Sequence, residues 1–92
     1  MINRRLRETG LCTDEERRLV LRADLYSEGI GVWEVEVREI DGAGRRIQSR
    51  YTTETEARDA MEAAYAYGRQ HGMWHIDRAP GYQPSSEIAR QN

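Results

Sequence analysis

The chain of 92 residues contains no lysine, no phenylalanine and a single cysteine, and each of these gaps narrows what the protein can be. Because Cys12 is alone, no disulfide bond can form within the chain, and a reducing cytoplasm fits this composition. Without phenylalanine, and with aromatic residues at only 8%, the core has to be thin. We therefore expect one small domain of modest stability. Contact with a partner or a second copy would increase that stability.

Long apolar segments are also missing from the sequence. No apolar run approaches the length that spans a membrane, and the stretch MINRRLRETGL lacks the apolar centre of a secretion signal. The formal net charge is −2, from 14 basic and 16 acidic residues, which disfavours a protein whose main task is to neutralise phosphates. These features predict a cytoplasmic protein without a membrane partner.

All of the basic residues are arginine. A GC-rich bacterial or phage genome is the simpler explanation for this usage. A need for the planar, bidentate contacts of guanidinium groups at an interface is the alternative.

The first 28 residues hold the main ambiguity of the fold. Residues 1–17 are polar, and Thr13 with Glu16 three places on matches a capping box, which predicts a short helix there. The next segment, RRLVLRADLYSEG, alternates as a strand does, yet it would also be amphipathic as a continuation of that helix. We favour the strand, because the strong strand after it needs an antiparallel neighbour. Its predicted buried side carries Leu19, Leu21, Ala23 and Leu25.

Two further strands and a helix follow. Residues 32–40, VWEVEVREI, alternate clearly, and RIQSRYT returns after the turn DGAGR. A second capping box, Thr53 with Glu56, starts a helix that stops before Gly72. The strands are expected to bury Trp33, Val35, Val37, Ile47, Ser49 and Tyr51, and the helix Ala57, Ala60, Met61, Ala64 and Gly68.

The predicted fold class is therefore α+β, with a three-stranded antiparallel sheet packed on one C-terminal helix in the order β-β-β-α. Residues 18–77 form this single domain, residues 1–17 are a polar N-terminal segment, and residues 78–92 are expected to be a mobile tail. Before that tail, MWHID is either a short edge strand or an apolar segment that closes the core.

Hairpin geometry predicts which charges meet on the solvent side of the sheet. A tight second hairpin places Glu36 across from Arg50, and a tight first hairpin places Arg22 across from Glu36, or from Glu34 after a slip of two. The arginines are thus expected to be cross-strand partners of central glutamates. Exposed pairs of this kind contribute about 0.2 to 1 kcal/mol each.

The spacing Gly31-x-Trp33, Gly42-x-Gly44-Arg45 and Tyr51-Thr52-Thr53-x-x-Glu56-Ala57 resembles two groups of small domains over about residues 31–64. One is the AP2-like, arm-type DNA-binding domain of phage integrases, and the other is a set of short, uncharacterised bacterial proteins. The first resemblance implies a sheet that enters the major groove. In that group the exposed sheet face is generally basic, whereas this chain has Glu34 and Glu36 at its centre.

Few residues match the patterns of catalytic or metal sites. His71 and His75 have the spacing of metal ligands on a helix, but Gly72 separates them and nothing places Cys12 nearby. No nucleophile set with a family spacing and no phosphate-binding glycine loop is present. We expect no enzyme activity, no metal and no cofactor.

The sequence favours a small non-enzymatic protein-binding module. One specific form is a phage or mobile-element inhibitor of host machinery, similar in size and charge to anti-CRISPR proteins. The alternative is a nucleic-acid-binding domain that uses Arg38, Arg45 and Arg46 with an N-terminal arm of Arg4, Arg5 and Arg7. A monomer or a weak homodimer through an edge strand is expected. The candidate partner-binding residues are Arg22, Tyr26, Glu34, Glu36, Arg38, Arg46 and Arg50 on the sheet, with Glu54, Glu56 and Asp59 at the helix start.

Overall fold

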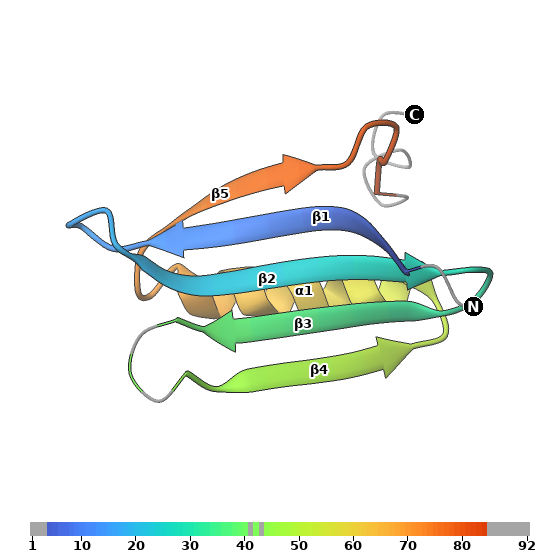
Figure 1. Ribbon diagram of the computed structural model, residues 1–92, viewed down its shortest axis with the longest axis horizontal. Coiled ribbons are helices and arrows are strands. Elements are labelled where there is room, and N and C mark those ends of the chain that lie inside the picture. Colours follow the sequence, from blue (N-terminus) through green and yellow to red (C-terminus); the bar gives the residue numbers. More distant parts are fainter. Residues whose placement is uncertain (1–3, 41, 43, 85–92) are drawn as a thin grey trace.

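The computed structural model describes residues 4–40, 42 and 44–84, which form five strands and one helix. The strands are β1 (Arg4–Thr13), β2 (Leu19–Glu28), β3 (Trp33–Glu39), β4 (Arg46–Tyr51) and β5 (Met73–Arg78), and the helix is α1 (Glu54–Gly68). The strands pair antiparallel in one sheet with the order β4-β3-β2-β1-β5 (Figure 1). The predicted α+β class is confirmed. The prediction of three strands and a C-terminal helix is wrong, because α1 lies between β4 and β5.

The largest departure is β1, where the sequence predicted a polar segment and a short helix. Thr13 ends the strand, and Asp14 then closes a tight turn, with its N–H donating to the Arg18 carbonyl at 2.9 Å. The Asp14 carboxylate accepts from the N–H groups of Glu16 and Arg18, at 2.9 Å each. Arg17 adopts a positive φ of 64°, which favours a turn over a helix start. The segment after the turn is β2, so the favoured strand is confirmed.

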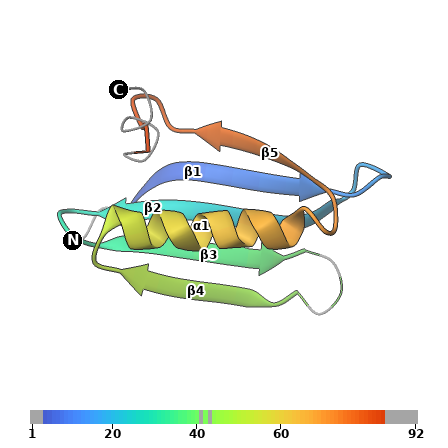
Figure 2. The same cartoon turned by 180° about the vertical axis from the view of Figure 1, so that it is seen from behind.

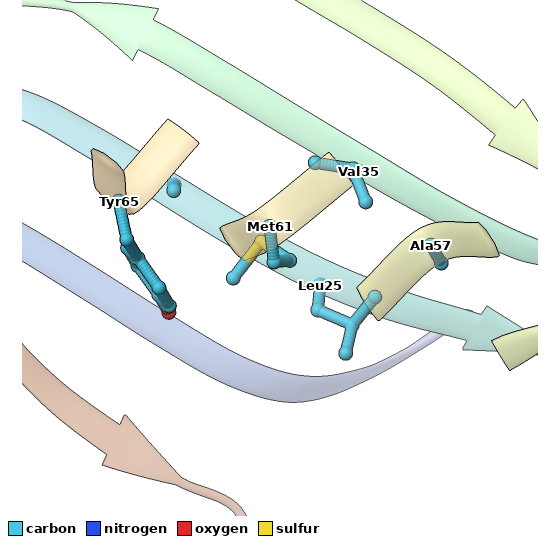
Figure 3. Close-up of a cluster of buried hydrophobic side chains, with 6 residues drawn as sticks. Leu25, Val35, Ala57, Met61 and Tyr65 are labelled. Carbon is cyan, nitrogen blue, oxygen red and sulfur yellow. The ribbon is translucent and has the colours of Figure 1, made fainter. Parts of the chain in front are cut away.

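Helix α1 covers one face of the sheet and lies behind β2 and β3 in Figure 1, whereas Figure 2 shows it in front. The buried apolar cluster between the two layers is Ala23, Leu25, Val35, Ala57, Met61 and Tyr65 (Figure 3). The sheet positions in this cluster were predicted to face inward. Tyr65 was missed, because the predicted helix stripe followed the small residues.

The start of α1 matches the predicted capping box. The Thr53 hydroxyl accepts from the Glu56 N–H at 3.2 Å, and it donates to the Glu56 carboxylate at 3.0 Å. The first of these bonds satisfies one of the backbone donors that a helix start otherwise leaves without a partner. Glu54 and Glu56 lie in the first turn, where the helix dipole favours negative charge.

The end of α1 lies against β5, which confirms the edge-strand alternative for MWHID. Trp74 donates from Nε1 to the Tyr65 carbonyl at 2.9 Å. The two rings pack edge-on, with their centroids 4.8 Å apart. Gly68 makes this approach possible, because a Cβ there would lie 2.3 Å from Cζ2 of Trp74. Past β5, Ala79 donates to the Arg7 carbonyl at 2.9 Å, Tyr82 packs on the core and Pro84 is buried. The rest of the predicted tail, residues 85–92, lies outside the described residues.

The two predicted hairpin registers are each wrong by two residues. Arg50 lies opposite Glu34, and Glu36 lies opposite Gln48. On the other side of β3, Arg22 lies opposite Arg38. The first hairpin is centred on position 30 and the second on position 42, each one residue away from the predicted centre, and this displacement shifts both pairings by two. Positive φ angles at Gly29 and Gly31 permit the first turn. Among the described residues, no helix has the length and hydropathy needed to cross a membrane.

Candidate functional site

The sheet face turned away from α1 is covered by no other element among the described residues, and we refer to it as the open face (Figure 1). Its central part is a set of arginines and carboxylates on four adjacent strands. We call this set the arginine–carboxylate layer. It consists of Arg4, Arg22, Asp24, Glu28, Glu34, Glu36, Arg38, Arg46 and Arg50.

The two kinds of charge lie at different depths in this layer. The four carboxylate residues are buried, with exposed fractions of 4% to 9%. The five arginine side chains are 40% to 67% exposed. Guanidinium groups therefore form the outer surface, and the carboxylates lie beneath them.

Glu36 is the centre of the layer. Its carboxylate is 2.9 Å from Nη2 of Arg38 and 2.9 Å from Nε of Arg46, and it accepts from Gln48 at 3.3 Å. Burial on its own would raise the pKa of Glu36, but Arg38 and Arg46 outweigh it and hold that pKa below the ordinary value. The group therefore stays ionised and fixes two guanidiniums in place.

Two other contacts reach across an intervening strand. Arg4 of β1 extends over the ring of Tyr26 on β2, 3.8 Å from the ring centroid, and contacts Glu34 of β3 at 3.0 Å. This hydrogen bond raises the pKa of Arg4 above its ordinary value. Arg50 of β4 likewise reaches Glu28 of β2 at 3.4 Å. Such diagonal contacts hold the arginines flat on the sheet.

The predicted ion-pair partners of Arg22 and Arg50 are therefore wrong. Arg22 binds Asp24 of its own strand at 3.0 Å, and Thr9 donates to the same carboxylate at 2.8 Å. Arg50 binds Glu28, although it lies opposite Glu34. The register shift and the length of the arginine side chain cause these differences.

The structure brings seven predicted binding residues together and leaves three apart. All seven that were expected on the sheet lie on the open face. The acidic residues of the helix start, Glu54, Glu56 and Asp59, belong to the other layer. Glu56 is also engaged locally, since its carboxylate accepts from the hydroxyls of Thr52 and Thr53. One flat partner surface cannot contact both sets.

A second charged cluster, under α1, was missed entirely. Glu8 is fully buried, and its carboxylate accepts from Arg58 at 2.7 Å, from Tyr65 at 2.6 Å and from Arg78 at 2.7 Å. Burial would raise the pKa of Glu8, but these three hydrogen bonds hold it below the ordinary value. Burial and the Glu8 carboxylate raise the pKa of Tyr65.

A bulge in β1 explains why sequence alternation did not reveal Glu8. The pairing moves from Leu6 opposite Tyr26 to Glu8 opposite Leu25, which leaves Arg7 as an extra residue. Even-numbered residues therefore face the open side before the bulge and the helix side after it. After the bulge, the helix-side residues Gly10 and Cys12 flank the apolar Leu11, so this segment shows no clear alternation in the sequence. Glu8 serves the fold, because it joins β1, α1 and β5.

The remaining reactive side chains do not form a catalytic arrangement among the described residues. Cys12 donates from Sγ to the Gly68 carbonyl at 3.4 Å, and burial raises the pKa of its thiol, which disfavours a nucleophilic thiolate. His75 is hydrogen-bonded to Thr13, and His71 lies against the Tyr67 ring. No three histidine, cysteine or acidic side chains of the described residues are placed to hold a metal ion.

What the open face offers chemically is an array of donors. A guanidinium has five N–H groups, and contact with one carboxylate leaves several of them directed outward. Carboxylates beneath the array limit the movement of each arginine. Such an array suits partners that bear planar, acidic acceptors. No protein-family model, no curated protein and no solved structure matches this chain.

Proposed function

We propose that the protein is a non-enzymatic protein-binding module that uses the open face to engage carboxylates of a partner protein. The main support for this proposal is that the arginines of the arginine–carboxylate layer are exposed and its carboxylates are buried beneath them. Five half-exposed guanidiniums lie on four buried carboxylates, which fix the positions of the arginines before any partner arrives.

Prior fixing of the arginines favours binding on entropic grounds. Immobilising a flexible side chain at an interface costs about 0.5 to 1.5 kcal/mol. Here Arg38, Arg46 and Arg4 already lose much of that freedom in the free protein. Arginine and tyrosine are also enriched among the residues that dominate binding energy, and Tyr26 lies directly beneath Arg4.

The charge balance of the layer favours a protein over a nucleic acid as the partner. Every arginine of the layer already contacts a carboxylate, so its positive charge is largely compensated at short range. A polyanion gains affinity chiefly from uncompensated positive charge and counterion release. A protein surface with a few carboxylates needs only local, directional hydrogen bonds, which the face supplies.

A nucleic-acid-binding domain is the second candidate, and one observation favours it. Glu34 and Glu36, which depart from the basic sheet face of the DNA-binding group, are buried beneath arginines that form the outer surface. Against it, Arg4, Arg5 and Arg7 are part of β1 and do not form a separate arm. The narrower hypothesis of a phage-encoded inhibitor stays a prediction that rests on size and charge.

Position-specific crosslinking in the source cell tests the proposal. A photo-crosslinking amino acid replaces Gln48, which is exposed on the open face, and a control chain carries it at Ala66, which is exposed on α1. We expect an adduct between position 48 and a protein other than a second copy of this chain, which is absent from position 66 and survives nuclease treatment.

Two arginine variants complete that experiment. Arg50→Ala removes an exposed guanidinium of the layer, and Arg69→Ala removes an exposed one at the end of α1. The adduct at position 48 should fall several-fold with the first variant and remain with the second. Adducts that disappear with nuclease would favour the nucleic-acid candidate, and equal adducts at both positions would contradict binding through the open face.

A further inference from the structure

An apolar groove lies on the opposite face of the sheet, between α1 and the strands β3 and β4. It has a volume of about 450 Å³, and its lining includes Val37, Ile47, Tyr51, Ala63 and Tyr67. Because α1 lies over β2 and β3 (Figure 2), the helix side of β4 is only partly covered. Ile47 is 62% exposed and Tyr67 is 49% exposed, although Ile47 points toward the helix layer.

The same strand has an unpaired edge. β4 is the last strand of the sheet, so among the described residues no strand pairs with its outer side. Glu39 donates to the Arg45 carbonyl at 2.7 Å, which marks these two residues as a hydrogen-bonded pair. Along an antiparallel ladder, hydrogen-bonded pairs alternate with non-hydrogen-bonded pairs, whose backbone N–H and C=O groups point away from the partner strand. Arg46, Gln48 and Arg50 therefore turn their backbone N–H and C=O groups toward the free edge.

The sequence of β4 is complementary to itself in one antiparallel register. With a two-fold axis at Ser49, Ile47 lies opposite Tyr51 of a second copy, and Gln48 lies opposite Arg50 of that copy. The backbone groups at Gln48 and Arg50 then form the hydrogen-bonded pairs, as the free edge requires. An axis at Gln48 would instead oppose Arg46 to Arg50 of the second copy, and like charges in that position are unfavourable.

We propose that a second copy of this chain occupies the β4 edge, in an antiparallel pair centred on Ser49. The two sheets then form one continuous sheet with both helices on the same side. Ile47 and Tyr51 of each copy cover the groove that the other leaves open. The two open faces lie side by side on the opposite surface, so dimerisation does not depend on what the open face binds.

At the other edge of the sheet, two of the β5 side chains that face the helix layer already have partners within the same chain. On β5, Trp74 packs on Tyr65 and Arg78 binds Glu8, so both side chains are engaged within the same chain. Ile76 is 48% exposed on the same side of the strand as these two residues. It therefore provides a matched control for Ile47.

Sedimentation across a concentration series is the first test. The wild-type protein should reach twice the chain mass of 10.7 kDa and dissociate on dilution. Ile47→Asp should remain at the monomer mass at concentrations where Ile76→Asp still dimerises. Circular dichroism shows whether each variant is folded. A wild-type monomer at all concentrations, or a dimer that only Ile76→Asp dissociates, would overturn the proposal.

Disulfide crosslinking tests the register and leaves Ile47 and Tyr51 in place. In the background Cys12→Ala, Ser49→Cys should form a covalent dimer on mild oxidation, because directly opposed residues of a non-hydrogen-bonded pair lie about 4.5 Å apart. Gln48→Cys should not, because its equivalents are offset by two residues in this register. Crosslinking through position 48 and not through position 49 would overturn the Ser49-centred pairing.

Discussion

Glu36 shows how much the stability of this sheet depends on single buried carboxylates. An exposed ion pair contributes little, and the sequence suggested that Glu36 belongs to such pairs. The structure instead buries Glu36 to 4% exposure and gives it two arginine partners. Loss of its charge leaves both guanidiniums without their anion, and a buried amide takes the carboxylate's place.

We expect Glu36→Gln to lower the free energy of unfolding by about 1 to 3 kcal/mol, since a buried charged partner is lost while the arginines keep partial hydration. Glu16→Gln is the matched control, because the ion pair between Glu16 and Arg18 is largely exposed. That change should stay within about 0.5 kcal/mol. Urea denaturation of both variants measures the difference, and equal effects would show that the depth of Glu36 has no energetic consequence.

Glu8 makes the second residue-scale prediction, which concerns pH. Its pKa is lower in the folded protein than the ordinary value of 4.5. A carboxylate of this kind stabilises the fold at every pH above the pKa of the unfolded chain. The stabilisation is lost as the pH falls through the lower, folded pKa. Stability should therefore decline as the pH falls below about 4.5, and urea denaturation from pH 7 to pH 3 measures it.

The variant Glu8→Gln isolates this contribution. At neutral pH it should cost about 3 to 5 kcal/mol, because two arginines lose a buried partner. The acid-dependent decline should also become shallower. Glu62→Gln is the control, since Glu62 contacts the same Arg58 but is 56% exposed. A neutral-pH loss as small as that of Glu62→Gln would contradict the role given to the buried carboxylate.

At the scale of elements, the junction of α1 and β5 depends on the absence of a side chain at Gly68. Replacing a helix glycine with alanine usually stabilises a helix by about 1 kcal/mol. Here the added Cβ would overlap the Trp74 indole, at 2.3 Å from Cζ2. We expect Gly68→Ala to destabilise the protein by about 1 to 3 kcal/mol, because the indole has to move out of its packed position.

A double-mutant cycle separates two effects of Gly68→Ala, the gain in helix propensity and the overlap with Trp74. In the background Trp74→Ala the clash is gone, so Gly68→Ala should be neutral or stabilising there. Thermal or urea denaturation of the four proteins provides the measurement. Destabilisation of equal size in both backgrounds would mean that Trp74 is not what excludes a side chain at position 68.

At the scale of the whole molecule, charge distribution limits what the protein binds. The net charge is −2, and the arginines of the open face are paired with carboxylates. We expect duplex DNA to bind no more tightly than a Kd of about 10⁻⁵ M at physiological salt, because few phosphates can be neutralised. Fluorescence anisotropy measures this affinity. A much tighter complex with a steep salt dependence would favour the nucleic-acid candidate over the protein-binding one.

The sequence by itself determined three of the strands and the start of the helix. Alternation identified β2, β3 and β4 with their inward residues, and the Thr53–Glu56 pair marked the start of α1. Both signals depend only on the geometry of one element, with period 2 in a strand and satisfied N–H groups at a helix end. The residues of β3 and β4 on the open face were also predicted, since they alternate with the inward ones, whereas Arg4 of β1 was not.

Only the tertiary structure decided how those elements combine. A one-residue bulge at Arg7 reverses the alternation of β1, so the polar N-terminal segment conceals a strand and a buried glutamate. The position of each turn sets the hairpin register, and long arginine side chains reach past their nearest neighbours. These features depend on residues distant in the chain, which no local period records. For the same reason, the burial of Glu36 beneath Arg38 and Arg46 emerged only when the strands were placed side by side.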